Sequence, residues 1–188
     1  MSRSKLIVIA GPSGCGKTTI AKAILQKYSD IAFSVSATTR IKRNVEIDGK
    51  DYFFISREEF EGKIRRNELI EWEQIYGDYY GSLKEEVDNA FKAGRSILFD
   101  VDVRGALSVR KKYPEDAVSI FIKPPSLELL MERLKNRRTE TPESLARRME
   151  RVTMEMNQAA DFDYCVVNDD LDNAIASVDA IIKAAILT

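Results

Sequence analysis

Gly11-Pro12-Ser13-Gly14-Cys15-Gly16-Lys17-Thr18 fits the phosphate-binding loop pattern G-x-x-x-x-G-K-[ST]. The apolar run 6–10 before it predicts a buried strand, and residues 18–28 after it repeat apolar side chains at helical spacing. The glycines allow successive backbone N–H groups to point at an anion. The following helix directs the positive end of its dipole to the same place. The stretch therefore predicts a nucleotide phosphate site, against the alternative of a glycine-rich turn that binds nothing.

Composition excludes several classes of protein. The 188 residues suit one α/β domain, and 29 basic against 30 acidic residues give no excess that would favour a nucleic-acid partner. No apolar run approaches a membrane span, so a soluble, cytoplasmic protein is expected. The chain has no histidine, which excludes Ser-His-Asp, Cys-His and His-metal chemistry. Cys15 and Cys165 are expected to stay unpaired in a reducing compartment.

Further apolar runs predict the rest of a sheet. They alternate with amphipathic helices, which favours a mostly parallel sheet covered on both faces. The runs are residues 31–35, 96–100, 117–122 and 164–167, and a last helix is expected at 171–187. Residues 34–80 break the alternation and are interpreted as an inserted subdomain. It has strand-like stretches at 52–56 and 69–73 and a helix at 58–67. A second irregular, arginine-rich piece covers residues 133–151.

The insert contains the residues of a second binding site. Arg40 and Arg43, with two tyrosines, could hold a second phosphate by bidentate and hydroxyl contacts. Glu71 beside Ser82 could accept hydrogen bonds from the N1–H and exocyclic amine of guanine, whereas adenine has no donor at N1. Each residue also has an ordinary interpretation. The tyrosines could be packing residues, Glu71 could lie on a half-buried strand, and the arginine-rich piece could be the solvated face of a helix.

Taken together, these segments resemble the guanylate kinase family. The resemblance covers nearly the whole chain in order, and its segments are residues 11–18, 34–52, 70–82, 100–105, 124–126, 133–148 and 167–170. It implies the reaction ATP + GMP ⇌ ADP + GDP with Mg²⁺, and GMP and ATP (with dGMP) as small-molecule partners. It also implies a P-loop NTPase three-layer sandwich with a parallel five-stranded core sheet, an inserted GMP-binding subdomain and a helical lid.

The resemblance also implies roles for single residues. The guanine side would comprise Ser36, Glu71, Ser82 and Asp102, and the GMP phosphate clamp Arg40, Arg43, Tyr52 and Tyr80. ATP would contact Gly11, Pro12, Ser13, Gly14, Cys15, Gly16, Lys17, Thr18 and Thr19, with Asn168 near adenine. Thr18 would ligate Mg²⁺ directly and Asp100 through water. The catalytic cations would be Lys17, Arg133, Arg137 and Arg148.

The expected organisation is one domain with three parts. The core would comprise residues 1–33, 84–132 and 152–188, the insert about 34–83 and the lid about 133–151. The chain departs from the family pattern at Val45, Arg104 and Arg138, which stand where glycine, glutamine and glycine are usual. Trp72, next to Glu71, is expected to adjoin the guanine pocket. The sequence does not indicate an oligomeric state.

Three alternatives remain at this point. Guanylate-kinase-like modules of scaffold proteins bind phosphorylated peptides without catalysis, but they typically lack an intact phosphate loop. A relative of the same fold could phosphorylate another small phosphate ester. Plain ATP hydrolysis is disfavoured, because a whole acceptor site accompanies the loop.

Overall fold

The computed structural model describes residues 4–75, 77–135 and 142–187. Its core sheet has five strands in the order β2-β7-β1-β8-β9, and all of its neighbouring strands pair in parallel. The strands are β1 (Leu6–Ala10), β2 (Ile31–Phe33), β7 (Ser96–Asp100), β8 (Ala117–Lys123) and β9 (Tyr164–Val167). Every residue of β1 is buried, as expected for the central strand of a parallel sheet that is covered on both faces.

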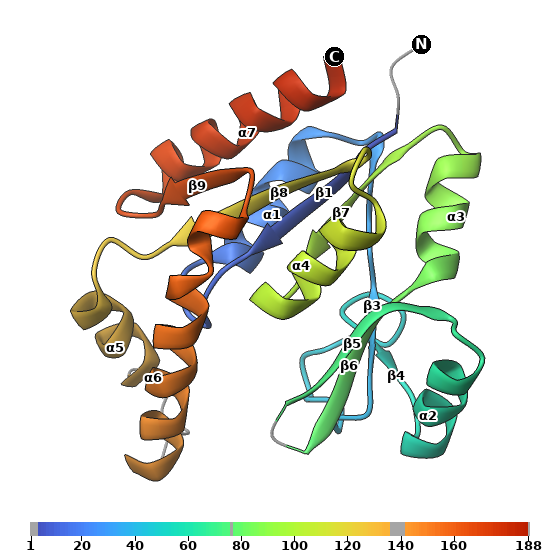
Figure 1. Cartoon of the computed structure of the whole chain (residues 1–188), viewed down its shortest axis with the longest axis horizontal. Helices are drawn as coiled ribbons and strands as arrows, with labels where there is room; N and C mark the ends of the chain where they lie inside the picture. The colour runs from blue at the N-terminus through green and yellow to red at the C-terminus, as the bar shows by residue number, and fades with distance from the viewer. Residues whose placement is uncertain (1–3, 76, 136–141, 188) are drawn as a thin grey trace.

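Helices cover both faces of this sheet (Figure 1). On one face, α1 (Lys17–Lys27) and α7 (Leu171–Leu187) bury Ile20, Ile24, Val178 and Ile182 in one apolar cluster. On the other, α3 (Lys84–Lys92) and α4 (Val103–Lys112) contribute to a second cluster that includes Phe99 and Phe121. The layers are therefore helix, sheet and helix, and the predicted α/β class with a five-stranded parallel core sheet is confirmed.

A second, four-stranded sheet has the order β4-β3-β6-β5. Its strands are β3 (Ser36–Thr38), β4 (Phe53–Phe54), β5 (Leu69–Ile75) and β6 (Asp78–Leu83), with α2 (Arg57–Arg65) packed against it through Phe60. Ser56 caps α2 by accepting a hydrogen bond from the Glu59 amide at 3.1 Å. This sheet lies within the segment that was predicted as an insert, although the boundaries of the insert remain a prediction.

Two further helices, α5 (Leu127–Lys135) and α6 (Pro142–Asn157), precede the short 3₁₀ helix η1 (Ala159–Asp161). Figure 1 shows α5 and α6 projecting from the core on the same side as the second sheet. Leu130 of α5 and Val152 of α6 pack together in a small apolar cluster. The second sheet and the two helices therefore flank the end of the core sheet at which the phosphate loop lies.

Local patterns located most elements to within a few residues. The predicted strands 6–10, 96–100 and 164–167 have the observed bounds, whereas the strand predicted at 31–35 ends at Phe33 and the one predicted at 52–56 shrinks to Phe53–Phe54. Strand β3 was not predicted. Its three residues, Ser-Ala-Thr, have no apolar run, and the strand exists through its pairing with β6.

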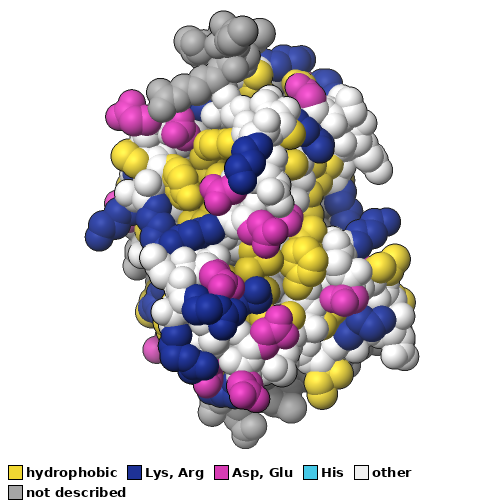
Figure 2. Space-filling model, turned by 90° about the vertical axis from the view of Figure 1, so that its right-hand side faces the viewer, with side chains coloured by type: hydrophobic (Ala, Val, Ile, Leu, Met, Phe, Trp, Pro, Cys, Tyr) yellow, Lys and Arg dark blue, Asp and Glu magenta, His cyan; other side chains and the backbone are white. Residues whose placement is uncertain are grey.

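The surface agrees with the balanced composition. On the face shown in Figure 2, basic and acidic side chains are interspersed rather than gathered by sign. Within the described part of the chain, no helix combines the length and the apolar character needed to cross a bilayer.

Candidate active site

The phosphate loop depends on glycines with positive φ. Gly11, Gly14 and Gly16 have φ values of 146°, 88° and 98°, a region in which glycine is strongly preferred. Space is equally limited, because a Cβ at Gly11 would lie 2.3 Å from the Ile122 carbonyl oxygen. The same atom at Gly16 would lie 2.3 Å from Nδ2 of Asn168. The loop therefore lies directly against β8 and the residue that follows β9.

Lys17 and Thr18 begin helix α1 at this loop. The Lys17 ammonium group donates to the carbonyl oxygens of Gly11 at 2.7 Å and Pro12 at 3.2 Å. The Thr18 hydroxyl donates to Oδ2 of Asp100 at 2.6 Å. Residues of the loop and the first turn enclose a cavity of about 160 Å³, which is lined by Ser13, Gly14, Gly16, Lys17, Thr18 and Thr19. Lys17 and Thr18 thus line this small space, and Asp100, which accepts the Thr18 hydrogen bond, lines the larger cavity described below.

Cys15 and Asn168 support the loop from behind. Asn168 is buried, and its side-chain amide donates to the Cys15 carbonyl oxygen at 2.7 Å. The Cys15 side chain is fully buried, and this burial raises the pKa of its thiol. A buried thiol with a raised pKa is a poor nucleophile, so Cys15 is a packing residue. The contact of Asn168 with adenine remains a prediction.

Glu71 is a buried carboxylate on β5. Ser82, opposite it on β6, donates its hydroxyl to Oε1 of Glu71 at 2.7 Å. Burial, with a smaller contribution from nearby Asp102, raises the pKa of Glu71 from 4.5 to about 7, although the Ser82 hydrogen bond acts to lower it. Ser36 on β3 pairs with Ser82 across the sheet. The sheet therefore brings three of the predicted guanine-side residues together.

The residues of the predicted phosphate clamp lie close together. Arg40 holds both carboxylate oxygens of Glu46, at 2.7 and 3.1 Å, and its guanidinium lies 5.6 Å from the centre of the Tyr52 ring. The Arg43 amide donates to the same carboxylate at 2.7 Å. The Arg40 contact lowers the pKa of Glu46. Tyr80 meets Tyr52 edge to face at 6.1 Å.

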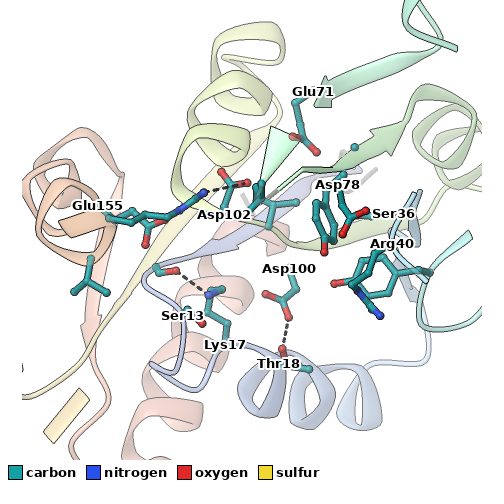
Figure 3. Close-up of a pocket in the computed structure, with 18 of the residues that line it drawn as sticks. Ser13, Lys17, Thr18, Ser36, Arg40, Glu71, Asp78, Asp100, Asp102 and Glu155 are labelled. Atoms are coloured by element: carbon teal, nitrogen blue, oxygen red, sulfur yellow. Dashed lines mark hydrogen bonds and ion pairs between the residues drawn. The ribbon is translucent and has the colours of Figure 1, made fainter. Parts of the chain in front are cut away.

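One cavity of about 480 Å³ joins the two regions. It spans the core sheet, the second sheet and helix α6. Figure 3 shows Lys17 and Thr18 on one side of it and Glu71 on the other. Predicted residues that line it are Gly11, Ser13, Lys17, Thr18, Ser36, Arg40, Arg43, Tyr52, Glu71, Tyr80, Asp100 and Asp102. Ser82 is fully buried and lies behind Glu71 rather than on the cavity surface.

The cavity also has lining residues that the sequence analysis did not single out. Arg151 and Glu155 on α6 line it, as does Asp78 on β6. The Arg151–Glu155 pair, with Nε to Oε1 at 2.8 Å, has the i,i+4 spacing of a helical ion pair and could have been recognised from that spacing. The contact between Arg151 and Glu73 of β5 spans 78 residues, and no local pattern indicates it.

Trp72 does not adjoin the guanine pocket as expected. Its side chain is 48% exposed, and its ring packs edge to face on Tyr79 with centroids 5.8 Å apart. Successive residues of a strand point to opposite faces, so the position next to Glu71 puts Trp72 on the other side of β5. Glu71 and Ile75 line the cavity from the same strand, and Trp72 is absent from its lining.

The predicted catalytic arginines fall partly outside the described structure. Arg137 lies outside the described residues. Arg133 on α5 and Arg148 on α6 are described only in their backbone, not in their side chains. Their roles remain predictions. The departures at Val45 and Arg104 are described: Val45 is 88% exposed, and Arg104 donates to Glu73 at 3.4 Å. Neither replaces a residue of the phosphate clamp.

The chain is similar to known proteins in sequence and in structure. The family model described as "Guanylate kinase" matches residues 3–185. Guanylate kinases of Chlorobaculum tepidum and Symbiobacterium thermophilum are each 47% identical to the chain over 95% of its length, which covers 91% and 84% of those proteins. The crystal structure of guanylate kinase from Anaplasma phagocytophilum superposes with a TM-score of 0.83 at 32% identity, covering all of this chain and 88% of that one. The chain belongs to the guanylate kinase family.

Proposed function

We propose that the chain transfers the γ-phosphoryl group of ATP to GMP, giving ADP and GDP, as the sequence predicts and as the names of its relatives indicate. The observation that carries this proposal is the shared cavity. A phosphate loop at one end and a buried carboxylate with two arginines at the other line one space of about 480 Å³. Two substrates bound there would have their phosphates directed toward each other.

The donor would be held by the loop amides and Lys17. Lys17 now donates to two loop carbonyls, and transfer of these hydrogen bonds to ATP phosphates would bring its charge to the reacting group. Thr18 at the start of α1 and Asp100 at the end of β7 suit a divalent cation, because their oxygens lie 2.6 Å apart and Mg²⁺ prefers oxygen ligands shared with phosphates. A metal held there would supply positive charge beside the β- and γ-phosphates.

The acceptor needs no general base. A phosphate monoester has a second pKa of about 6 and is largely dianionic near neutral pH, so its attacking oxygen is already deprotonated. The work of the protein is alignment and neutralisation of charge. We assign the GMP phosphate to Arg40, Arg43, Tyr52 and Tyr80. The lid arginines Arg133, Arg137 and Arg148 are proposed to stabilise the transferring group.

Base selection is proposed to rest on Glu71. Its ionised form, with Oε1 already oriented by Ser82, could accept hydrogen bonds from the N1–H and amine of guanine. Adenine would present a lone pair at N1 to the same carboxylate and leave it without a partner, which is costly in a buried site. Ser36 and Asp102 would complete the base side, and dGMP would be accepted by the same contacts. The enzyme would act in the cytoplasm.

The decisive experiment is an ADP-release assay with ATP, Mg²⁺ and each of GMP, dGMP, AMP, CMP and UMP in turn. The proposal expects rapid release with GMP and little with AMP. Release that is equal for all monophosphates, or that occurs without any, would instead indicate ATP hydrolysis. The matched control is Glu71→Gln, which keeps the size of the side chain and should remove the preference for GMP over AMP.

A further inference from the structure

One guanidinium joins three parts of the molecule. Arg151 of α6 donates from Nη2 to Oε2 of Glu73 at 2.9 Å, and the same nitrogen lies 3.9 Å from Oδ2 of Asp102. Its Nε donates to Glu155 at 2.8 Å. Glu73 belongs to β5 of the second sheet, and Asp102 caps α4 of the core. In Figure 3 a dashed line joins Asp102 to a side-chain nitrogen beside Glu155, at one side of the cavity, and marks this ion pair.

These carboxylates adjoin the guanine side. Glu71 and Glu73 are two residues apart on β5 and so share a face of the strand, about 7 Å apart. Asp102 is itself a proposed guanine-side residue, and its other carboxylate oxygen accepts from the Gly105 amide at 2.8 Å. A base bound between Glu71 and Asp102 would therefore lie beside the Arg151 contacts.

The other partner of Arg151 points to the ATP side. Glu155 lines the cavity, and Arg151 and Lys17 both lower its pKa against the rise that burial imposes. Glu155 therefore experiences the charge of the residue that begins the phosphate loop helix. Burial alone would lower the pKa of Arg151, but hydrogen bonds to Glu155 and Glu73 raise it overall. One helical turn of α6 thus lines the cavity that the two substrate sides share.

The ion pairs are sheltered enough to hold α6 in place. The side chains of Glu73 and Glu155 are 15% and 9% exposed, and that of Arg151 is 25% exposed. Arg104 also contacts Glu73, at 3.4 Å, but its side chain is 65% exposed and it belongs to α4. Arg148, a proposed lid arginine, stands three residues before Arg151 on α6. The contacts of Arg151 therefore also fix the helical turn that carries Arg148.

We propose that Arg151 is a positioning residue that couples the guanine side of the cavity to helix α6, through Glu73 and Asp102, so that GMP and ATP strengthen each other's binding. This inference rests on the proposed function, because it requires both nucleotides to occupy the cavity. Guanine bound at Glu71 and Asp102 orders the side of the cavity that Arg151 contacts through Glu73 and Asp102. ATP phosphates at Lys17 favour a Glu155 whose negative charge is compensated. The Arg151 guanidinium supplies that compensating charge. Coupling between two sites is reciprocal, so either ligand can be varied.

The test measures the Kd of GMP by calorimetry, without and with a saturating imido analogue of ATP and Mg²⁺. The ratio of the two Kd values is the synergy. We expect synergy of about fivefold or more in the unmodified enzyme. Arg151→Gln and Glu73→Gln should each reduce it toward one. The double variant should lose no more than Arg151→Gln alone, because that variant already removes the link to Glu73.

Two controls separate coupling from a structural role. Arg104→Gln removes the other guanidinium near Glu73 and should leave synergy unchanged. Arg151→Lys keeps the charge but not the planar fork, so it should retain part of the synergy. A purely structural ion pair would lower the melting temperature of Arg151→Gln without changing the ratio of Kd values.

The outcomes distinguish this inference from the proposed function. GMP binding with unchanged synergy in Arg151→Gln would overturn the inference alone, as would a ratio of one in the unmodified enzyme. An equal loss in Arg104→Gln would assign the effect to the charge of Glu73 and overturn the role of α6. Failure of the unmodified enzyme to bind GMP at all would overturn both.

Discussion

Gly105 makes the space that the Glu71 carboxylate occupies. A Cβ at position 105 would lie 2.8 Å from Oε2 of Glu71 and 3.1 Å from its Cδ. Gly105 is in the first turn of α4, where its own amide donates to the capping residue Asp102. Ser82 holds the opposite oxygen of the carboxylate at 2.7 Å. Helix α4 and strand β6 therefore hold the Glu71 carboxylate from two sides.

Gly105→Ala should consequently impair GMP recognition without destabilising the protein. The added methyl would displace the carboxylate, and we expect the KM for GMP to rise by about tenfold or more, the effect of losing a charge-assisted hydrogen bond. Alanine favours helix over glycine by about 1 kcal/mol, so the melting temperature should not fall. Steady-state kinetics and a thermal melt measure the two effects.

Gly62→Ala is the matched control for this substitution. Gly62 is also in a helix, α2, and a Cβ there would first meet the end of the flexible Arg66 side chain at 2.9 Å. That side chain can move, so kinetics with GMP should not change. A raised KM in both variants would mean that the effect comes from placing alanine in a helix and not from a clash with Glu71.

GMP binding should release a proton near and below pH 7. Burial raises the pKa of Glu71 to about 7, whereas guanine would bind the ionised carboxylate, so binding lowers that pKa and affinity falls as the pH drops below about 7. Calorimetry at pH 6.5 in two buffers of different ionisation enthalpy measures the released proton. Guanosine should be used beside GMP, because its lack of a phosphate removes the phosphate titration.

The same group should affect the stability of the ligand-free protein with the opposite sign. Between pH 4.5 and about 7 the folded protein keeps a proton on Glu71 that the unfolded chain releases. The free energy of unfolding therefore falls as the pH rises through this window. Glu71→Gln should remove this contribution and also the proton release. If Glu71→Gln releases as many protons with guanosine as the unmodified protein does, Glu71 is not the group that meets the base.

Lys17→Met should cut kcat by about 10²-fold or more, the cost of removing one preorganised charge from a phosphoryl-transfer site. Methionine preserves much of the side-chain volume, and the hydrogen bonds lost are those to the Gly11 and Pro12 carbonyls. The melting temperature should therefore change little. The measurements are kcat with saturating ATP and GMP, and a thermal melt. Near-normal turnover would refute the phosphate site.

The two cysteines should differ sharply toward N-ethylmaleimide. Cys165 is exposed, whereas Cys15 is fully buried with a raised pKa. One equivalent should react quickly, leaving kinase activity intact, and Cys165→Ser should abolish that fast phase. Mass spectrometry of the labelled protein identifies the site. Rapid modification at Cys15, with loss of activity, would show that the loop opens in solution.

Local signals made the core and the phosphate loop predictable. Residues 6–18 combine a continuous apolar run, glycines and a helix start in one segment, so no distant residue is needed to recognise them. Glu71 and the arginines of the insert were predicted through the resemblance to a family. The sequence pattern alone left them open to ordinary interpretations.

The features that escaped prediction depend on distant pairing. Strand β3 exists because it pairs with β6 more than 40 residues later, and the Arg151–Glu73 contact spans 78 residues. Trp72 was misplaced because a neighbour in sequence was treated as a neighbour in space, although alternation along β5 separates it from Glu71. Glycine at 105 likewise has no visible reason until Glu71 is seen against it.

The contact between Asn168 and Cys15 has a consequence for how the protein is made. It joins residues 153 positions apart, and Asn168 directly follows β9, which pairs with β8 at the edge of the core sheet. During synthesis the loop would leave the ribosome 153 residues ahead of the residue that supports it. A contact of such long range also carries a large cost in loop-closure entropy. The phosphate loop therefore cannot gain this support until β9 and the residue after it have been made.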